Sequence, residues 1–357
     1  MSQKEPQNIT PQERSRRFQL ATRQNYQMLA QQTVYSGASN MRFELPKTRF
    51  LSKFLIQIKA KLKIKHASET TVPVDEFTPY KLIQSLNLDL NNGWKPYDIG
   101  GRQLALLNAI RLNPSIVFPQ STNPSGYCYL PELTASPTGA ENEISFHVEL
   151  PVTTNDRDTM GIILLQTQDM LCTLNINYAN GNAMVDNAAG YEVQISEIST
   201  KVLWESFSVP GTPLAYPDIS VMKIVNSRTE MFTGSGANTL RLPTGTVYRK
   251  LAFYITDEHG VPFEDDDFTS DLMLTFNQTD TNYAVDASCF RALNELQLGY
   301  ALPKGCFVFD FSNNGVPNYG GTRDFIDTTA LSEFWLRFHS KKAGVCHVVM
   351  EQLSQLV

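Results

Sequence analysis

The stretch LNLDLNNGWKPYDIGGRQLALLNAIRLN, residues 86–113, recurs in diverged form as LMLTFNQTDTNYAVDASCFRALNELQLG, residues 272–299. The two align without a gap at an offset of 186 positions, and seven of the 28 aligned positions are identical. The identical pairs are Leu86/Leu272, Leu88/Leu274, Asn91/Asn277, Tyr97/Tyr283, Leu107/Leu293, Asn108/Asn294 and Leu112/Leu298. A repeat of this length indicates a duplicated domain, because the repeating unit of a solenoid is only about 20–50 residues long.

The duplication extends upstream of this stretch. A Leu-Pro dipeptide precedes the apolar segment Phe50–Lys59 and another precedes Val247–Thr256, with Lys53 opposite Lys250. The offset here is 197 rather than 186, so the first copy has about 11 additional residues at this point. We assign them to the loop between the first two strands of the copy.

Most of the chain after residue 45 has the pattern of β-strands. Apolar side chains at 56, 58, 60, 62 and 64 alternate with polar ones, which is the period of a strand with one buried face. Similar short alternations recur between clusters of Gly, Pro, Asn and Asp, with little helix, and this predicts an all-β protein. Each copy has room for about eight strands, so we expect two tandem eight-stranded jelly rolls (a double jelly roll) at residues 46–207 and 208–357.

Residues 1–45 are predicted to form an N-terminal helical arm. Thr10-Pro11-Gln12-Glu13 combines a capping hydroxyl, a proline suited to the first helical position and a glutamate that reaches back to the cap. We expect a helix from about Pro11 to about Gln32. Its apolar side is a narrow stripe of Phe18, Ala21, Met28 and Leu29, so the helix is expected to dock on another surface.

The arm is basic while the rest of the chain is acidic. Residues 1–32 carry five basic and two acidic residues, net +3, so the remainder carries −9 of the total of −6. Arg14, Arg16, Arg17 and Arg23 beside the apolar stripe can lie on anionic lipid, each contributing about 1 kcal/mol. Packing against a neighbouring subunit is the alternative partner for this helix, and the two are compatible.

Composition excludes several classes of protein. The net charge of −6 argues against direct nucleic-acid binding. No apolar run approaches the roughly 18 residues of a membrane span, and the polar start of the chain does not resemble a signal peptide. Five cysteines with no Cys-x-x-Cys pair predict free thiols in a protein made in a reducing cytoplasm.

No catalytic or metal-binding pattern is found, so we expect no enzyme activity and no cofactor. Tandem β-domains invite comparison with a metal-binding bicupin, but none of the five histidines lies two positions from another. The acidic run at 257–267 lacks the spacing of a calcium loop and is expected to be a solvated loop tip. Whether it holds a cation is open at this stage.

An arm followed by two similar jelly rolls without an active site resembles the double jelly-roll major capsid proteins of tectivirus-type phages, the tailless icosahedral phages with an internal membrane. The resemblance is to the phages of Gram-positive hosts in particular. The resemblance covers the whole chain: the N-terminal helix, the strand TRFLSKFLIQIKAKLKI, the two LN-containing repeats and the closing strand Cys346–Gln352.

The resemblance implies a virion capsid protein, synthesised in the cytoplasm of a bacterial host. Its homotrimers would be pseudo-hexagonal blocks that tile an icosahedral shell. Its partners would be itself, minor capsid proteins, penton or vertex proteins, and the lipids of the inner membrane. The membrane-facing residues of the arm would be Arg14, Arg16, Arg17, Phe18, Arg23, Met28 and Leu29.

Two alternatives remain open on sequence alone. A tandem binding module, such as a vertex spike or a lectin-like protein, would gather exposed aromatic side chains at one end of a domain, and Trp94 and Tyr97 could supply these. A bicupin enzyme would hold a transition metal.

Overall fold

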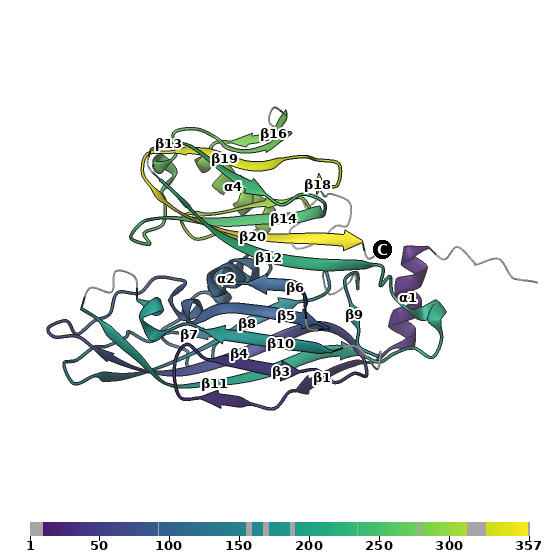
Figure 1. Ribbon diagram of the computed structural model, residues 1–357, viewed down its shortest axis with the longest axis horizontal. Helices are drawn as coiled ribbons and strands as arrows, with labels where there is room; N and C mark the ends of the chain where they lie inside the picture. Colours follow the sequence, from purple (N-terminus) through teal and green to yellow (C-terminus); the bar gives the residue numbers. More distant parts are fainter. Residues whose placement is uncertain are drawn as a thin grey trace, which may run out of the picture.

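The computed structural model describes residues 10–91, 93–154, 159–166, 171–185, 190–233, 235–277, 280–312 and 326–355. It consists of two lobes, one lying on the other, with the N-terminal half of the chain in the lower lobe of Figure 1 and the C-terminal half in the upper. Each lobe is a pair of four-stranded antiparallel sheets, and the core of each lobe lies between its two sheets.

The second lobe has sheets in the orders β12-β20-β14-β17 and β13-β19-β15-β16. Numbered along the chain, these eight strands give the orders 1-8-3-6 and 2-7-4-5, the arrangement of a jelly roll. Their bounds are β12 Val221–Phe232, β13 Gly236–Leu242, β14 Val247–Asp257, β15 Leu272–Phe276, β16 Asp280–Val285, β17 Cys306–Asp310, β19 Phe334–Ser340 and β20 Gly344–Gln355.

The first lobe repeats this order strand for strand. Its sheets are β1-β11-β4-β8 and β3-β10-β5-β6, which again read 1-8-3-6 and 2-7-4-5. The bounds are β1 Gln24–Met28, β3 Asn40–Glu44, β4 Phe50–Lys65, β5 Ile83–Leu90, β6 Trp94–Ile99, β8 Ala140–Pro151, β10 Cys172–Tyr178 and β11 Glu192–Phe207. The expected all-β double jelly roll is therefore confirmed.

Short strands and helices complete the two lobes. Four short strands extend the sheets: β2 Gln32–Val34 beside β11, β7 Cys128–Tyr129 beside β8, β9 Ile163–Leu164 beside β4 and β18 Ile326–Asp327 beside β14. The α-helices are α1 Pro11–Ala21, α2 Gly101–Ala109, α3 Pro114–Val117 and α4 Ala287–Leu298. Helices α2 and α4 occupy equivalent places, each following the fifth strand of its jelly roll.

The predicted arm helix is too long. Helix α1 begins as expected, with the Thr10 hydroxyl accepting a hydrogen bond from the Glu13 amide at 3.2 Å, but it ends at Ala21 instead of Gln32. Thr22 is extended, and Thr22, Asn25 and Tyr26 have low helix propensity. Residues Gln24–Met28, which the sequence pattern assigned to the helix, instead form β1, and their backbone hydrogen bonds are made to β11.

Most of the expected arm is consequently part of the first jelly roll. Residues 24–44 contain its first two strands, β1 and β3, together with β2. The strands that the sequence indicated as first and second in each copy are the third and fourth. The extra length of the first copy lies partly in the strand itself, since β4 has 16 residues where β14 has 11.

Two identical asparagines of the repeat perform the same task in both lobes. The Asn108 side chain of α2 donates to the Glu149 carbonyl at 2.7 Å and accepts from the Glu149 amide at 2.7 Å. Asn294 of α4 makes the same pair of bonds to Val308, at 2.7 and 2.9 Å. Each amide thus fixes the helix to the sixth strand of its jelly roll, where a buried backbone pair would otherwise lack partners.

We expect Asn294→Ala to lower the free energy of unfolding by about 2–4 kcal/mol, because it leaves the amide and carbonyl of Val308 buried and unpaired. Asn282→Ala, at an exposed position of β16, is the matched control and should change stability by less than about 0.5 kcal/mol. Chemical denaturation of both variants measures the difference. Equal stabilities would contradict this role of the Asn294 amide.

Candidate functional site

We call the contact between the two jelly rolls the joint, and it is the candidate functional site among the described residues. The edge strand β6 of the first jelly roll pairs in parallel with the edge strand β12 of the second, Tyr97 opposite Val225 and Asp98 opposite Asn226. This pairing joins one sheet of each lobe into a sheet of nine strands (Figure 1). The joint is continuous with the first core, which includes Ala252, Tyr254 and Val349 from the second lobe.

Helix α2 fills the space beside this pairing. Every side chain of the helix except that of Arg102 is buried. The Gln103 amide donates to the Thr229 hydroxyl at 3.0 Å, and Arg102 lies 3.1 Å from the His347 imidazole. At Gly101 a Cβ would lie 1.9 Å from the Tyr80 carbonyl oxygen. A glycine is therefore required for α2 to approach the backbone of Tyr80 this closely.

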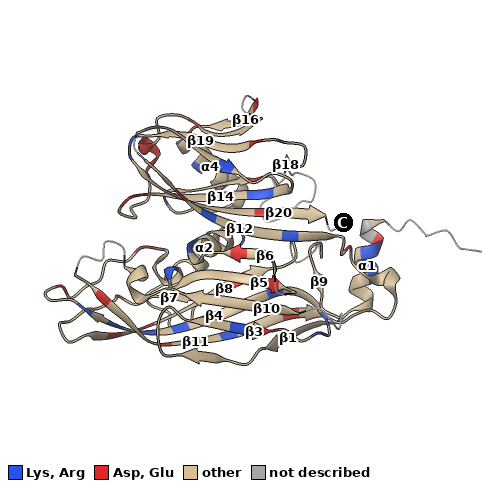
Figure 2. Cartoon of the chain, viewed as in Figure 1, with Lys and Arg blue, Asp and Glu red and all other residues tan. Residues whose placement is uncertain are grey.

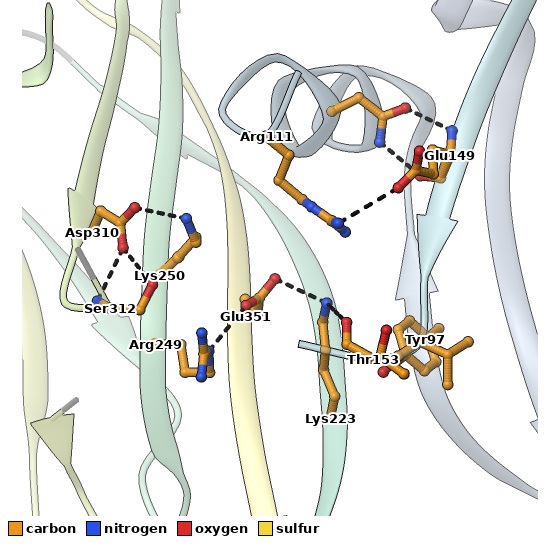
Figure 3. Close-up of polar contacts among 12 residues, drawn as sticks. Tyr97, Arg111, Glu149, Thr153, Lys223, Arg249, Lys250, Asp310, Ser312 and Glu351 are labelled. Carbon is orange, nitrogen blue, oxygen red and sulfur yellow. Dashed lines mark hydrogen bonds and ion pairs between the residues drawn. The ribbon is translucent and has the colours of Figure 1, made fainter. Parts of the chain in front are cut away.

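A buried cluster of charged side chains crosses the joint (Figure 3). The Glu351 carboxylate on β20 contacts Lys223 of β12 at 3.1 Å and Arg249 of β14 at 3.3 Å. Lys223 also donates to the Thr153 carbonyl of the first jelly roll at 3.1 Å. A flanking pair on each side completes the cluster, Arg111–Glu149 in the first lobe and Lys250–Asp310 in the second.

The electrostatics of the cluster follow from one buried carboxylate that faces several cations. Burial alone would raise the pKa of Glu351, but Lys223, Arg249, Lys250 and Arg111 outweigh it and hold this pKa at about 2. Burial lowers the pKa of Lys223 to about 7 against the opposing attraction of Glu351, and Arg111 and Arg249 add to the decrease. Burial, Arg102 and Lys81 together lower the pKa of His347 to about 3, so this imidazole is neutral.

The arrangement is suited to fixing an orientation. A buried charge left without its partner is strongly unfavourable, so any shift of the lobes that separates Lys223 from the Thr153 carbonyl is penalised. The cluster contains no nucleophile paired with a base, and no group of three metal-ligating side chains is found in the described part of the chain.

Helix α1 lies at one end of the sheets, near the end of β20, and carries basic side chains (Figures 1 and 2). The structure separates the seven residues predicted to face a membrane. Phe18 is buried against the rings of Phe50 and Phe207, at 5.8 and 5.4 Å between ring centroids, so it anchors the helix and is not available to lipid. This corrects its expected role.

The other predicted arm residues fall into two groups. Arg16 and Arg23 are exposed, and Arg14 and Arg17 are half-buried, with Arg17 paired to Glu13 at 2.5 Å. Met28 lies on β1 and is exposed, away from α1, whereas Leu29 packs partly against the first core. Leu20, which the sequence pattern did not single out, is 79% exposed on α1. Among the described residues no helix is long and apolar enough to cross a membrane.

Two of the histidines and the acidic loop make hydrogen bonds and ion pairs with neighbouring side chains. His147 lies 3.1 Å from Gln57 and His347 contacts Arg102, so these two are held at different sites. In the acidic loop, three carboxylates meet cations: Asp265 with Arg291 at 2.7 Å, Glu264 with Lys304 at 2.6 Å and Asp267 with Lys342 at 3.0 Å. The loop therefore has its own counter-charges.

The N-terminal half of the chain has a recognisable sequence relationship. Residues 26–202 match the family model described as P3 major capsid protein N-terminal. The match runs from β1 into β11 and so spans most of the first jelly roll. No curated protein matches the sequence.

Solved structures share the fold over nearly the whole chain. The STIV MCP, the coat protein of the Sulfolobus turreted icosahedral virus, superposes with a TM-score of 0.68 at 14% identity, covering 93% of this chain and 97% of that one. PBCV-1 VP54 gives 0.64 at 9% identity, with 94% and 95% covered. The major capsid protein P2 of bacteriophage PM2 gives 0.53 at 10% identity, with 94% and 98% covered. The chain has the double jelly-roll fold of viral capsid proteins.

The buried cluster at the joint was missed from the sequence. One signal was present, the alignment of Lys53 with Lys250 in the two copies. In the structure these lysines lie opposite equivalent glutamates in the strand register, Lys53 opposite Glu205 and Lys250 opposite Glu351. The sequence does not reveal that Glu351 lies at the joint, because that depends on contacts between residues far apart in the chain, such as Lys223 and Thr153.

We expect Glu351→Gln to lower the free energy of unfolding by about 3 kcal/mol, because Lys223 and Arg249 lose their shared counter-charge while remaining buried. Glu230→Gln is the matched control: Glu230 pairs with Arg228 at an exposed site and should cost less than about 1 kcal/mol. Calorimetry of the two variants at pH 7 compares them. A Glu351→Gln protein as stable as the control would contradict the role of the cluster.

The same carboxylate predicts a difference in acid stability. Its folded-state pKa of about 2 lies below the ordinary value of 4.5, so its contribution is fully present above pH 4.5 and is lost as the pH falls toward 2. Between those pH values, wild type should lose about 3 kcal/mol more stability than Glu351→Gln. Denaturation curves of both proteins measured through this window test the prediction, and parallel curves would refute it.

Proposed function

We propose that this chain is a major capsid protein that forms pseudo-hexagonal homotrimers, which tile an icosahedral viral shell. The observation that carries the proposal is the combination of two jelly rolls with identical strand order and a fixed joint, in the fold shared with the STIV, PBCV-1 and PM2 coat proteins. The family match of residues 26–202 supports it from the sequence.

The physical form of the molecule suits this role. Two similar domains at a fixed angle turn a threefold assembly into one with nearly sixfold outline, which fills a flat surface without gaps. A shell unit requires rigidity and extensive contact surfaces. The interlobe cluster, the α2 packing and the shared nine-stranded sheet provide the first of these.

The proposal includes a shell over an internal membrane, of tectivirus type and with a Gram-positive bacterial host. Support comes from the exposed Arg16 and Leu20 on α1 and from the exposed Arg23, which follows the helix. Arg14, Arg16, Arg17 and Arg23 would face anionic lipid. Penton, vertex and minor capsid proteins would be the other partners in the virion, and the protein would be made in the host cytoplasm.

The alternative of a binding module finds less support. Its expected aromatic cluster consisted of Trp94 and Tyr97, but Tyr97 is fully buried and its hydroxyl donates to the Val152 carbonyl at 2.9 Å. Trp94 alone is 42% exposed, and a single ring does not make a recognition platform.

Purified protein is expected to form a trimer, with three times the chain mass of 40.1 kDa, and to show a hexagonal outline. Light scattering measures the mass and negative-stain imaging the outline. A monomer at every concentration, or a trimer with a different outline, would overturn the capsid proposal.

Removal of residues 1–21 is expected to leave the trimer intact and to abolish binding to anionic vesicles. The deletion stops before β1, because removing that strand would expose the edge of β11. A matched variant, with Arg14, Arg16, Arg17 and Arg23 changed to Gln, keeps Phe18 in its pocket and should weaken vesicle binding at least tenfold, given about 1 kcal/mol for each charge. Co-flotation with anionic and neutral vesicles provides the measurement. Unchanged binding by both variants would contradict the membrane role and leave subunit packing.

A further inference from the structure

Helices α2 and α4 are equivalent in the repeat but differ in what covers them. In α2, the side chains of Gln103, Leu106, Leu107 and Ile110 are buried, and the helix contacts β14 and β20 of the second jelly roll. At an offset of 186, α4 has Cys289, Ala292, Leu293 and Leu296, and all four are exposed. Leu293 and Leu296 are 39% and 77% exposed. We call these four residues the α4 apolar face. They are spaced at i, i+3, i+4 and i+7, which places them on one side of the helix.

The surface that α2 covers in the second jelly roll has an equivalent in the first. Opposite α2 lie strands β14 and β20, and their register sets Lys250 beside Glu351 and Ala252 beside Val349. In the first jelly roll β4 and β11 set Lys53 beside Glu205 and Leu55 beside Leu203.

The register extends this equivalent surface onto β1. Glu205 is opposite Tyr26, and Leu203 is opposite Met28. Tyr26 is 59% exposed and Met28 57% exposed. A hollow at this surface is lined by Tyr26, Leu55 and Leu203 together with the charged side chains Lys53, Glu149 and Glu205. We call Tyr26, Met28, Leu55 and Leu203 the β1–β4 apolar face.

The edge strands are equivalent as well. Within the chain, β6, the fifth strand of the first jelly roll, pairs with β12, the first strand of the second. The corresponding strands are β16 and β1, and both lie at the edge of their sheets. The register Tyr97–Val225 and Asp98–Asn226 translates into Tyr283–Tyr26 and Ala284–Gln27. A row of strand-edge amides and carbonyls is a ready template for pairing with another chain.

From these correspondences we infer that the second jelly roll of one copy docks on the first jelly roll of a second copy. The α4 apolar face covers the β1–β4 apolar face, and β16 pairs in parallel with β1. The contact repeats between chains the joint that α2 and β6 make within one chain. Exposed Lys59 and Lys201 flank the receiving face and Glu295 flanks the α4 apolar face, so the charges at the rim are complementary.

This interface joins two different surfaces of the chain, so it is a head-to-tail contact. An assembly built from such contacts is closed only when the copies form a ring. It rests on the proposed capsid function, which supplies the number of copies in that ring. It goes further by naming the two faces and the strand register between them.

Disruption of the α4 apolar face is the first test. Leu293→Asp/Leu296→Asp should convert the trimer to monomer in light scattering while the melting transition of the monomer remains cooperative, because both side chains are exposed. Tyr26→Asp/Met28→Asp should do the same from the other face. Met231→Asp, at a side chain 82% exposed outside both faces, is the control and should stay trimeric.

Cross-linking tests the register independently of stability. In a Cys289→Ser background the other four cysteines are buried, so Gln27→Cys/Ala284→Cys adds two accessible thiols. A short bismaleimide should then give covalent chains of two and three subunits on a reducing gel. Each single variant should remain uncross-linked, because a head-to-tail contact brings position 27 only to position 284.

The possible failures are distinguishable. A wild-type protein that is monomeric at all concentrations would overturn both the capsid proposal and this interface. A wild-type trimer that tolerates both double Asp variants, or whose Cys pair does not cross-link, would overturn the interface and leave the capsid proposal standing. Cross-linking of either single variant would also overturn it, because that requires a two-fold contact.

Discussion

The parallel pairing of β6 with β12 is the contact on which the relation between the two jelly rolls depends. Only two residue pairs form it, so it is too short to hold the lobes by itself. Helix α2 provides apolar burial on one side, and Lys223, which is paired with Glu351 inside the second lobe, donates across the joint to the Thr153 carbonyl. Because the strand pairing sets the register and the buried Lys223–Thr153 contact penalises departures from it, these contacts fix the orientation of the two lobes.

Duplication explains why the same chemistry recurs with different outcomes in the two lobes. The asparagine that bonds the helix to the sixth strand is present in both lobes, because in each copy a buried backbone amide and carbonyl of that strand need hydrogen-bond partners. Another identical pair, Asn91 and Asn277, adopts positive φ at the end of the fourth strand in each lobe, with φ of +56° and +47°. The short amide side chain makes this left-handed turn accessible. What differs between the copies is the outer surface of the helix.

The arm illustrates how tertiary context overrides a local pattern. A capping box, a proline and a weak apolar stripe predicted one helix over Pro11–Gln32, and its start was right. The chain beyond Ala21 is extended because β11 offers a strand edge along its length, and an unpaired edge there would cost backbone hydrogen bonds. The sequence pattern placed Phe18 on the side of the helix that docks on another surface. In the structure Phe18 packs against Phe50 and Phe207 and so holds the helix to its own chain.

The sequence by itself determined the class of the fold and the duplication, because these follow from the period of apolar residues and from self-similarity. It also indicated the absence of a catalytic pattern. Only the tertiary structure decided that β1 and β3 belong to the first jelly roll, that Glu351 lies in a buried cluster, and that α2 is covered while α4 is exposed. The physical reason is that alternation records that one face of a strand is buried but not which distant segment buries it. Hydrophobic burial is non-directional, and the partner is selected by register, edge pairing and charge.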